Sequence, residues 1–251
     1  LVHGLMFTRG PADLRHSAIF VGGADVTAGS AVAERIKQTF FGPIRVSVML
    51  DGNGSNTTAA AAVLCAARHV DLAHSQALVL GGTGPVGQRV ARLLLSQGGQ
   101  VRLASRQAAR AAEVCHSLAV KRSNMTGEQL QPVATADRAA FEQCLESCNL
   151  IFSCGAAGVT LLDEQQLALA THAKVAIDLN AVPPAGIAGI AVTDKAINRT
   201  GRVDYGAIGV GGLKMKIHRE AIATLFTRND LFLDAEEIFA IGKNIEAATT
   251  V

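Results

Sequence analysis

Short apolar runs alternate along this chain with segments of helical periodicity, and this alternation restricts the possible folds more than any other feature. The apolar runs, each predicted to form a strand, are residues 17–23, 45–50, 76–80, 100–104, 149–153 and 175–179. Runs of this kind suit strands that helices cover on both faces, as in parallel sheets. Strands that alternate with helices in this way predict a doubly wound α/β fold.

Helices are predicted between and after these strands. The predicted ranges are 25–41, 56–69, 88–97, 108–118, 138–146, 162–171, 213–226 and 234–248. In the first of these helices, Val32, Ile36 and Phe40 recur at helical spacing and mark an apolar face. Ser55 is expected to cap the second helix, because its hydroxyl oxygen can accept an N–H of the first turn.

The composition excludes several classes of protein. Apolar residues make up 49% of the chain and charged residues 18%, which is unlike a disordered chain. A net charge of +2, a single Tyr and no Trp give no basis for a nucleic-acid surface. No apolar run reaches the roughly 18 residues of a membrane-spanning helix. The five scattered cysteines lack the close pairs of a zinc site, so we expect thiols in a reducing cytosol and no metal.

A glycine-rich turn lies between a predicted strand and a predicted helix. Its residues, Gly82-Thr83-Gly84-Pro85-Val86-Gly87, match the pattern G-x-G-x-x-G, which is informative in this context. In dinucleotide-binding folds the first glycine permits a tight turn, the second lets the backbone approach a pyrophosphate, and the third lets helix and strand pack closely. The N–H groups at the helix start then favour bound phosphate. The alternative is a glycine-rich turn without a ligand.

The residues after the next predicted strand bear on the choice of cofactor. A site for NAD would place an Asp or Glu there, about 20 residues after the glycines, to hold the ribose 2′-hydroxyl. This chain has Ser105 and Arg106 instead, and a guanidinium group suits a 2′-phosphate. The sequence therefore favours NADP, although NAD stays open because nothing here repels it. Alternatively, Arg106 is a solvated residue at a helix start.

Two later strands end in residues that suit the nicotinamide end of such a cofactor. Gly155 and Ala156 follow one strand and leave room for a ring, and Asn180 follows the other. In a doubly wound sheet, ligands bind outside the carboxyl ends of the strands, so these three residues are candidates for the cofactor crevice. Ordinary tight packing is the alternative for the small residues.

The length of 251 residues allows one to two domains, at about 150 residues each. We place the boundary near residues 70–75. Residues 75–212 are predicted to form a Rossmann domain that binds the dinucleotide. Residues 1–74 are predicted to form an N-terminal α/β domain for the substrate, and the helices within 213–251 are expected to pack back against it.

A polar run follows the predicted strand at 45–50. Asn53, Asn56 and Thr58 stand between that strand and an alanine-rich helix. A cap and a turn explain Ser55 and the glycines but do not require these three side chains together. They are therefore candidate substrate ligands, although a plain turn explains the spacing equally well.

Lys214 and His218 are four residues apart, so on a helix they share one face. Cationic groups at the start of a helix oppose the helix dipole, and this arrangement indicates a functional role. The alternative is a solvated basic face that also includes Lys216 and Arg219.

Five stretches of the chain resemble the bacterial methylene-tetrahydromethanopterin dehydrogenases. They are SVMLDGNGSNTTAAAA (47–62), LGGTGPVGQRVA (80–91), IDLNAVPPAGI (177–187), GVGGLKMKIHR (209–219) and FLDAEEIF (232–239). The resemblance covers nearly the whole chain. It implies the fold of the methylene-tetrahydrofolate dehydrogenases, which has two α/β domains with a cleft between them, and it implies active-site roles for Thr58, Lys214 and His218.

The resemblance further implies NADP or NAD as the cofactor, a homo-oligomer (a trimer or a multiple of one) and a place in the one-carbon metabolism of methylotrophs. Members of the family begin with a further strand that supplies an active-site phenylalanine. We expect the sequence of this chain to start after that strand.

The implied reaction is hydride transfer from the methylene carbon of methylene-tetrahydromethanopterin to C4 of the nicotinamide. Two nitrogens stabilise the methenyl cation that forms, so no general base is expected, and the sequence offers no obvious carboxylate–histidine pair. Lys214 is expected to orient the pterin through a carbonyl or an anionic group, while His218 and Thr58 position its rings. Two other functions stay open: oxidation of methylene-tetrahydrofolate, and a non-catalytic sensor that binds NADP.

Overall fold

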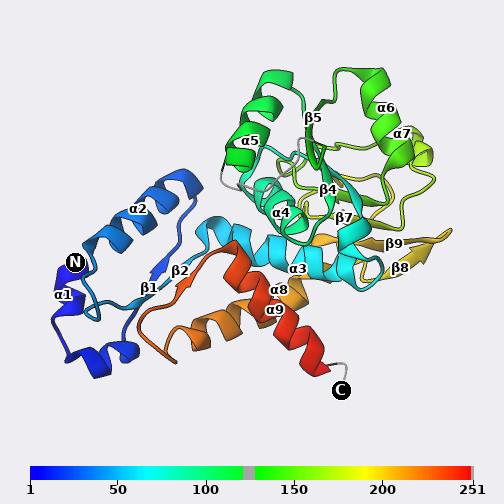
Figure 1. The fold of residues 1–251 in the computed structure, drawn as a ribbon. Helices are drawn as coiled ribbons and strands as arrows, with labels where there is room; N and C mark the ends of the chain where they lie inside the picture. The colour runs from blue at the N-terminus through cyan, green and yellow to red at the C-terminus, as the bar shows by residue number, and fades with distance from the viewer. Residues whose placement is uncertain (121–127, 250–251) are drawn as a thin grey trace. The chain divides into compact units, whose positions relative to one another are not determined.

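In the computed structural model, which describes residues 1–120 and 128–249, seven strands form the larger of two sheets (Figure 1). Their order is β5-β4-β3-β6-β7-β9-β8, and only β8 and β9 run antiparallel. The strands are β3 (Gln76–Leu80), β4 (Gln100–Ser105), β5 (Leu130–Ala134), β6 (Leu150–Ser153), β7 (Val175–Asp178), β8 (Ile197–Arg199) and β9 (Arg202–Tyr205). The strand order reverses between β3 and β6, and ligands of doubly wound sheets bind at such a point.

Helices cover both faces of this sheet (Figure 1). On one face α4 (Pro85–Ser96) packs with α5 (Ala108–Val120), and on the other α6 (Arg138–Ser147) packs with α7 (Glu164–Leu169). Because helices exclude water from both sides, a central strand such as β6 is buried along its whole length. The predicted doubly wound α/β fold is confirmed.

The smaller sheet is parallel and has the order β1-β2-β10. Its strands are β1 (Ala18–Val21), β2 (Ser47–Leu50) and β10 (Phe232–Leu233). The helix α2 (Val26–Thr39) begins after Asp25, whose carboxylate accepts the N–H of Ala28 at 2.9 Å, and it packs on β1 and β2. It does so through Ala33 and Ile36, whereas Val32 is 51% exposed. The prediction that Val32 belongs to the apolar face is therefore wrong.

The chain divides into two compact units. The first unit, residues 1–61 with 213–251, contains the smaller sheet, and the second unit, residues 62–212, contains the larger one. The predicted domain boundaries, 1–74 with 213–251 and 75–212, remain predictions. The other elements are α1 (Val2–Met6), η1 (Pro11–His16), η2 (Gly52–Gly54), α3 (Ser55–Ala67), η3 (Leu72–His74), α8 (Ala207–Thr224) and α9 (Ala235–Thr249). Within the described ranges no helix is both long and apolar enough to span a bilayer.

Four short strands have no counterpart among the predicted strands: β5, β8, β9 and β10. β5 contains Pro132, which cannot donate a hydrogen bond to a neighbouring strand, but it lies at the sheet edge, where a proline is tolerated. β10 has two residues, which is too short for a recognisable pattern. The helix predicted from 213 begins at Ala207, because the glycines at 209, 211 and 212 lie inside it rather than in a turn.

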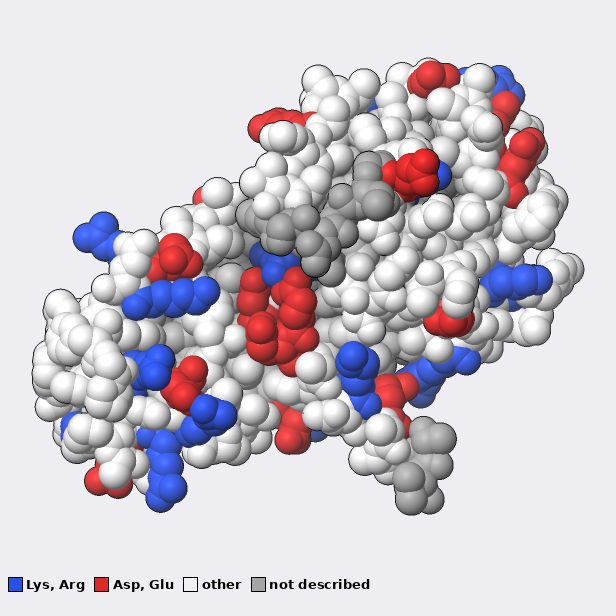
Figure 2. All heavy atoms as spheres, in the orientation of Figure 1, with Lys and Arg blue, Asp and Glu red and all other residues white. Residues whose placement is uncertain are grey.

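Charged side chains of both signs are interspersed on the face that Figure 2 shows, and acidic ones gather over the start of α9. Glu236 and Glu237 lie in the first turn of that helix, where the helix dipole favours negative charge. No disulfide occurs in the described part of the chain. Burial raises the pKa of Cys115 to about 11 and that of Cys148 to about 12, so these thiols stay protonated and pack as apolar groups.

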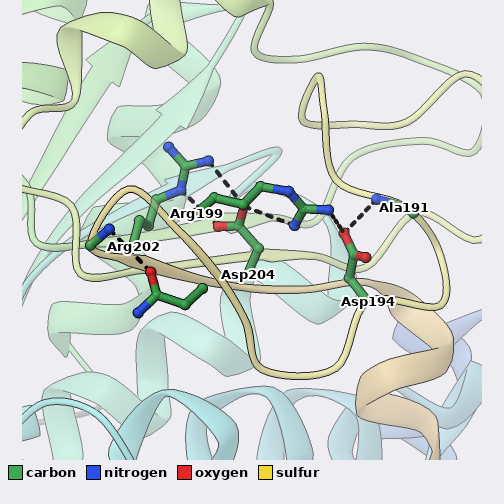
Figure 3. A network of polar contacts seen from close by, with 7 residues as sticks. Ala191, Asp194, Arg199, Arg202 and Asp204 are labelled. Carbon is green, nitrogen blue, oxygen red and sulfur yellow. Dashed lines mark hydrogen bonds and ion pairs between the residues drawn. The ribbon is translucent and has the colours of Figure 1, made fainter.

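A network of ion pairs fastens the β8–β9 hairpin (Figure 3). Asp204 on β9 is fully buried, and its two oxygens accept from Arg202 Nε at 2.7 Å and Nη2 at 3.0 Å. Arg199 lies 3.2 Å from Asp204 and 2.8 Å from Asp194, which in turn accepts the N–H of Ala191 at 2.7 Å. The hairpin and the loop before it are thus held by a buried carboxylate that two guanidinium groups compensate.

Removal of one arginine should leave the buried Asp204 carboxylate poorly compensated. We predict that Arg202→Met lowers the free energy of unfolding by about 3 kcal/mol, because breaking a buried ion pair leaves an uncompensated charge. Arg228→Met is the matched control, since Arg228 and Asp230 have the same Arg-x-Asp spacing but Arg228 is exposed. The control should lose at most about 1 kcal/mol. Urea unfolding measures both losses, and equal losses would contradict the prediction.

Candidate active site

The loop after β2 begins with a buried carboxylate, Asp51, which is 3% exposed. Its Oδ1 accepts the N–H groups of Asn56 at 2.9 Å and Thr57 at 3.2 Å, and its Oδ2 accepts the hydroxyl of Thr57 at 2.7 Å. Asp51 therefore satisfies the first N–H groups of α3. Ser55, the predicted cap, lies within α3, and its hydroxyl donates to the carbonyl of Gly52 at 2.7 Å. The prediction of Ser55 as the cap is wrong.

The turn that leads into α3 has a left-handed backbone at Asn53 (φ 53°) and Gly54 (φ 62°). The N–H of Asn53 donates to the carbonyl of Gly23 at 2.7 Å, and the residue is exposed. The half-buried Thr58 donates its hydroxyl to the Gly54 carbonyl at 2.6 Å. Because a hydroxyl oxygen also accepts, Thr58 keeps the capacity to bind a donor on a ligand.

Asn56 differs from its neighbours because it is fully buried. Its amide donates to the carbonyl of Leu50 and, at 2.9 Å, to Oδ1 of Asp234. These bonds connect the end of β2 with the turn before α9. In the structure the Asn56 side chain therefore connects two segments of the protein, whereas the sequence analysis predicted that it binds substrate.

Lys214 lies in the middle of α8, not at a helix start, so the dipole argument for its role does not apply. Its amine approaches the turn after β2: a Cβ built at Gly54 would lie 2.8 Å from Nζ of Lys214. Lys214 is half-buried and has no ion-pair partner among residues 1–120 and 128–249. An amine in this position can bind an anionic or carbonyl oxygen of a ligand.

His218 lies one helical turn after Lys214 and meets two residues that the sequence patterns did not indicate. Its Nδ1 is 3.6 Å from Oδ2 of Asp51, so a carboxylate–histidine pair is present although none was predicted. Its ring meets the ring of Phe20 edge to face, with centroids 6.0 Å apart. Asp51 was identifiable as a carboxylate directly after a buried strand, whereas Phe20 carries no such signal.

The glycines of the dinucleotide turn, which lies in the second unit, differ from one another in how closely other atoms pack against them. A Cβ at Gly87 would lie 2.7 Å from Cα of Gly82, and one at Gly82 would lie 2.6 Å from Leu103, so both positions are closely packed. A Cβ at Gly84 would meet only the carbonyl oxygens of Gly81 at 3.3 Å and Cys154 at 3.7 Å. Gly84 directly precedes α4, whose first turn leaves N–H groups without helical acceptors.

The other residues of this turn have ordinary helix-start positions. Pro85 is the first residue of α4, where its missing N–H is not needed, and Val86 follows it. The carbonyl of Thr83 accepts from Gln88 Nε2 at 2.8 Å. The first turn of α4 thus combines closely packed glycines with a less crowded side at Gly84, as a phosphate cradle requires.

Ser105 ends β4, and Arg106 follows it. Ser105 is half-buried, and its hydroxyl accepts the N–H of Gln107 at 3.3 Å. Arg106 is exposed, and in the described part of the chain its guanidinium has no ion-pair partner. A phosphate bound here would meet the positive charge of this guanidinium group.

Gly155 lies at the point where the strand order reverses. A Cβ built at Gly81 after β3 would lie 2.7 Å from both N and Cα of Gly155 after β6, so the two loops touch through backbone. Ala156 is exposed. Asn180 is 8% exposed, and its side chain accepts the N–H of Val182 at 3.0 Å and donates to the carbonyl of Pro184 at 2.8 Å. Asn180 therefore holds the loop after β7.

Two family models match parts of the chain. Residues 1–53 match the model described as methylene-tetrahydromethanopterin dehydrogenase, N-terminal. Residues 77–192 match the NAD dependent epimerase/dehydratase family. The second range contains the glycine turn, Ser105, Arg106 and the loops after β6 and β7, in agreement with a nicotinamide-cofactor domain.

Two solved structures are similar in fold. The transhydrogenase from Sinorhizobium meliloti has a TM-score of 0.51 at 15% identity, covering 97% of this chain and 77% of that chain. The A chain of dipicolinate synthase from Bacillus subtilis has a TM-score of 0.50 at 17% identity, covering 99% and 70%. At these identities the similarity concerns the fold alone.

Two proteins of Methylorubrum extorquens AM1 are similar in sequence over nearly the whole chain. The protein named bifunctional protein MdtA is 41% identical over 247 residues, which cover 97% of this chain and 84% of that protein. The NAD(P)-dependent methylenetetrahydromethanopterin dehydrogenase is 30% identical over 255 residues, which cover 98% and 84%. With the N-terminal family model, these identities show that the chain belongs to the methylene-tetrahydromethanopterin dehydrogenase family.

Proposed function

We propose that this chain oxidises methylene-tetrahydromethanopterin by hydride transfer to NAD(P)+, giving the methenyl form. The observation that carries the proposal is the grouping of functional side chains around the turn after β2. Thr58 donates to the Gly54 carbonyl, the Lys214 amine lies against Gly54, and His218 faces Asp51 at the start of the same turn. These residues belong to the first unit, whose N-terminal part matches the family model.

The glycine turn before α4 fits a dinucleotide. The start of the helix is less crowded at Gly84 than at Gly82 and Gly87, and the N–H groups of Val86 and Gly87 in the first turn can donate to a pyrophosphate. The backbone contact between Gly81 and Gly155 brings the loops after β3 and β6 together at the point where such cofactors bind. The bound cofactor supplies a nicotinamide C4 that accepts the hydride.

The residues of this chain are proposed to bind and orient rather than to move protons. Lys214 binds a carbonyl or an anionic group of the pterin, and His218 and Thr58 position its rings. Asn53 is a further candidate ligand because its side chain is exposed. The methylene carbon loses a hydride, and the adjacent nitrogens share the positive charge that remains, so no proton leaves in this step. A homo-oligomer and a cytosolic location remain predictions.

Lys214 gives the sharpest test of this assignment. We predict that Lys214→Ala lowers kcat/KM for the pterin about tenfold to a hundredfold, since a hydrogen bond to a charged group contributes about 1.5–3 kcal/mol. Lys216→Ala is the matched control, because Lys216 is exposed on the same helix but on another face. The measurement is nicotinamide reduction with methylene-tetrahydromethanopterin. A Lys214→Ala variant with full kcat/KM would overturn the role of Lys214.

The same assay separates the proposed function from its competitors. Faster turnover with methylene-tetrahydrofolate than with methylene-tetrahydromethanopterin would show that the carrier is a folate. Binding of NADP without any reduction in the presence of either carrier would show a sensor. Either result would overturn the proposed reaction while leaving the family assignment intact.

The glycines at 84 and 87 should respond differently to alanine. Gly84→Ala should change the free energy of unfolding by at most about 1 kcal/mol but weaken NAD(P) binding at least about tenfold, because the methyl group obstructs the approach of phosphate. Gly87→Ala should lower the free energy of unfolding by about 2 kcal/mol, because its Cβ would overlap Gly82. Urea unfolding and cofactor titration measure these effects. A Gly84→Ala variant with unchanged affinity would contradict the phosphate position.

We further propose that NADP is preferred over NAD, supported by the exposed Arg106 beside Ser105, whose guanidinium has no ion-pair partner among residues 1–120 and 128–249. Arg106→Ala should lower kcat/KM for NADP about tenfold to a hundredfold through the loss of a charge-assisted bond to the 2′-phosphate, with NAD little affected. Arg138→Ala, which removes an exposed arginine of α6, is the control. Equal losses for NADP and NAD would argue against a 2′-phosphate contact.

A further inference from the structure

We propose that Asp51 is a positioning residue for His218. It holds the imidazole in the tautomer that carries its proton on Nδ1, and so decides which ring nitrogen meets the substrate. The inference rests on the proposed function, in which His218 contacts the pterin. It concerns a carboxylate that helix spacing did not associate with Lys214 and His218.

The Asp51 carboxylate is rigid. Its side chain is 1% exposed, and Oδ1 is held by the N–H groups of Asn56 and Thr57. Oδ2 accepts the hydroxyl of Thr57 at 2.7 Å and lies 3.6 Å from Nδ1 of His218. This separation is longer than a hydrogen bond, so the carboxylate acts on the ring through its charge: a negative group beside one ring nitrogen favours a proton on that nitrogen.

Phe20 restrains the same imidazole from a second direction. The rings of Phe20 and His218 meet at 84°, with centroids 6.0 Å apart. With Asp51 at Nδ1 and Phe20 against the ring, Nε2 is the nitrogen left for a ligand, and the His218 side chain is 33% exposed. In the neutral ring, Nε2 is then a hydrogen-bond acceptor, which suits an N–H group of the pterin.

Asp51→Asn tests this role without removing the cap of α3. The asparagine keeps a carbonyl oxygen for the N–H groups of Asn56 and Thr57, but its amide donates where the carboxylate accepted. It therefore favours the other tautomer of His218. We expect kcat/KM for the pterin to fall on the order of tenfold to a hundredfold, with the KM for NAD(P) unchanged.

A double-mutant cycle separates positioning from general support of the fold. If Asp51 acts through His218, Asp51→Asn should cost less than about twofold in a His218→Ala background. An equal loss in both backgrounds would overturn the proposal. The matched control is Asp25→Asn, which makes the same substitution at the cap of α2 in the same unit and should leave activity unchanged. A comparable loss in this control would attribute the effect to the cap and overturn the proposal as well.

The tautomer itself can be measured without turnover. Nitrogen-15 spectra of the histidine side chains, recorded above about pH 8 where a free imidazole is neutral, distinguish the two tautomers. The His218 signals are those missing in His218→Ala. We expect Nδ1–H in the wild type and a shift toward Nε2–H in Asp51→Asn. Nε2–H in the wild type would overturn the proposal, whereas a lack of dehydrogenase activity would overturn only the proposed function.

Discussion

Buried carboxylates that accept hydrogen bonds hold the loops at the ends of strands in both units. A carboxylate removed from water without donors costs several kcal/mol or more, so each one requires N–H groups that converge on it. Asp51 gathers the first turn of α3 in this way. Asp178, 2% exposed at the end of β7, accepts the N–H groups of Gly186 at 2.7 Å and Ile187 at 3.2 Å. The backbone of the loops that follow β2 and β7 is thus fixed by buried carboxylates.

The cationic side chains in the described part of the chain differ in whether a carboxylate forms an ion pair with them. Arg199 and Arg202 form ion pairs with the buried Asp204 and support the fold. Lys214 and Arg106, by contrast, have no ion-pair partner among the described residues. A positive charge held near fixed backbone but left without a carboxylate attracts an anionic or carbonyl group from outside. This contrast sets the arginines of the hairpin, which support the fold, apart from the two cations proposed to bind ligands.

The sequence predicts the fold well where burial is uniform along a strand. β6 and β7 are found because helices cover both faces, every position is buried, and the apolar residues stand together in a short run. β9 is missed because Arg202 and Asp204 neutralise each other inside the protein, which makes the strand resemble a polar loop. At the site, helix spacing groups Lys214 with His218, but Phe20 and Asp51 join them only through packing of distant segments. Ser55 has suitable chemistry for a cap, yet the side chain of Asp51 accepts the first N–H groups of the helix instead.

The contact between Gly54 and Lys214 makes two distant positions depend on each other. A left-handed backbone at 54 already disfavours side chains, and the nearby amine removes the space that a Cβ would need. If position 54 alone is varied in a mutational library, selection for folded protein should therefore recover glycine. When position 214 is varied as well, a shorter residue there frees space but leaves the backbone strain, so only residues that tolerate a left-handed conformation, such as asparagine, should join glycine at 54, at the expense of the charge that the lysine presents.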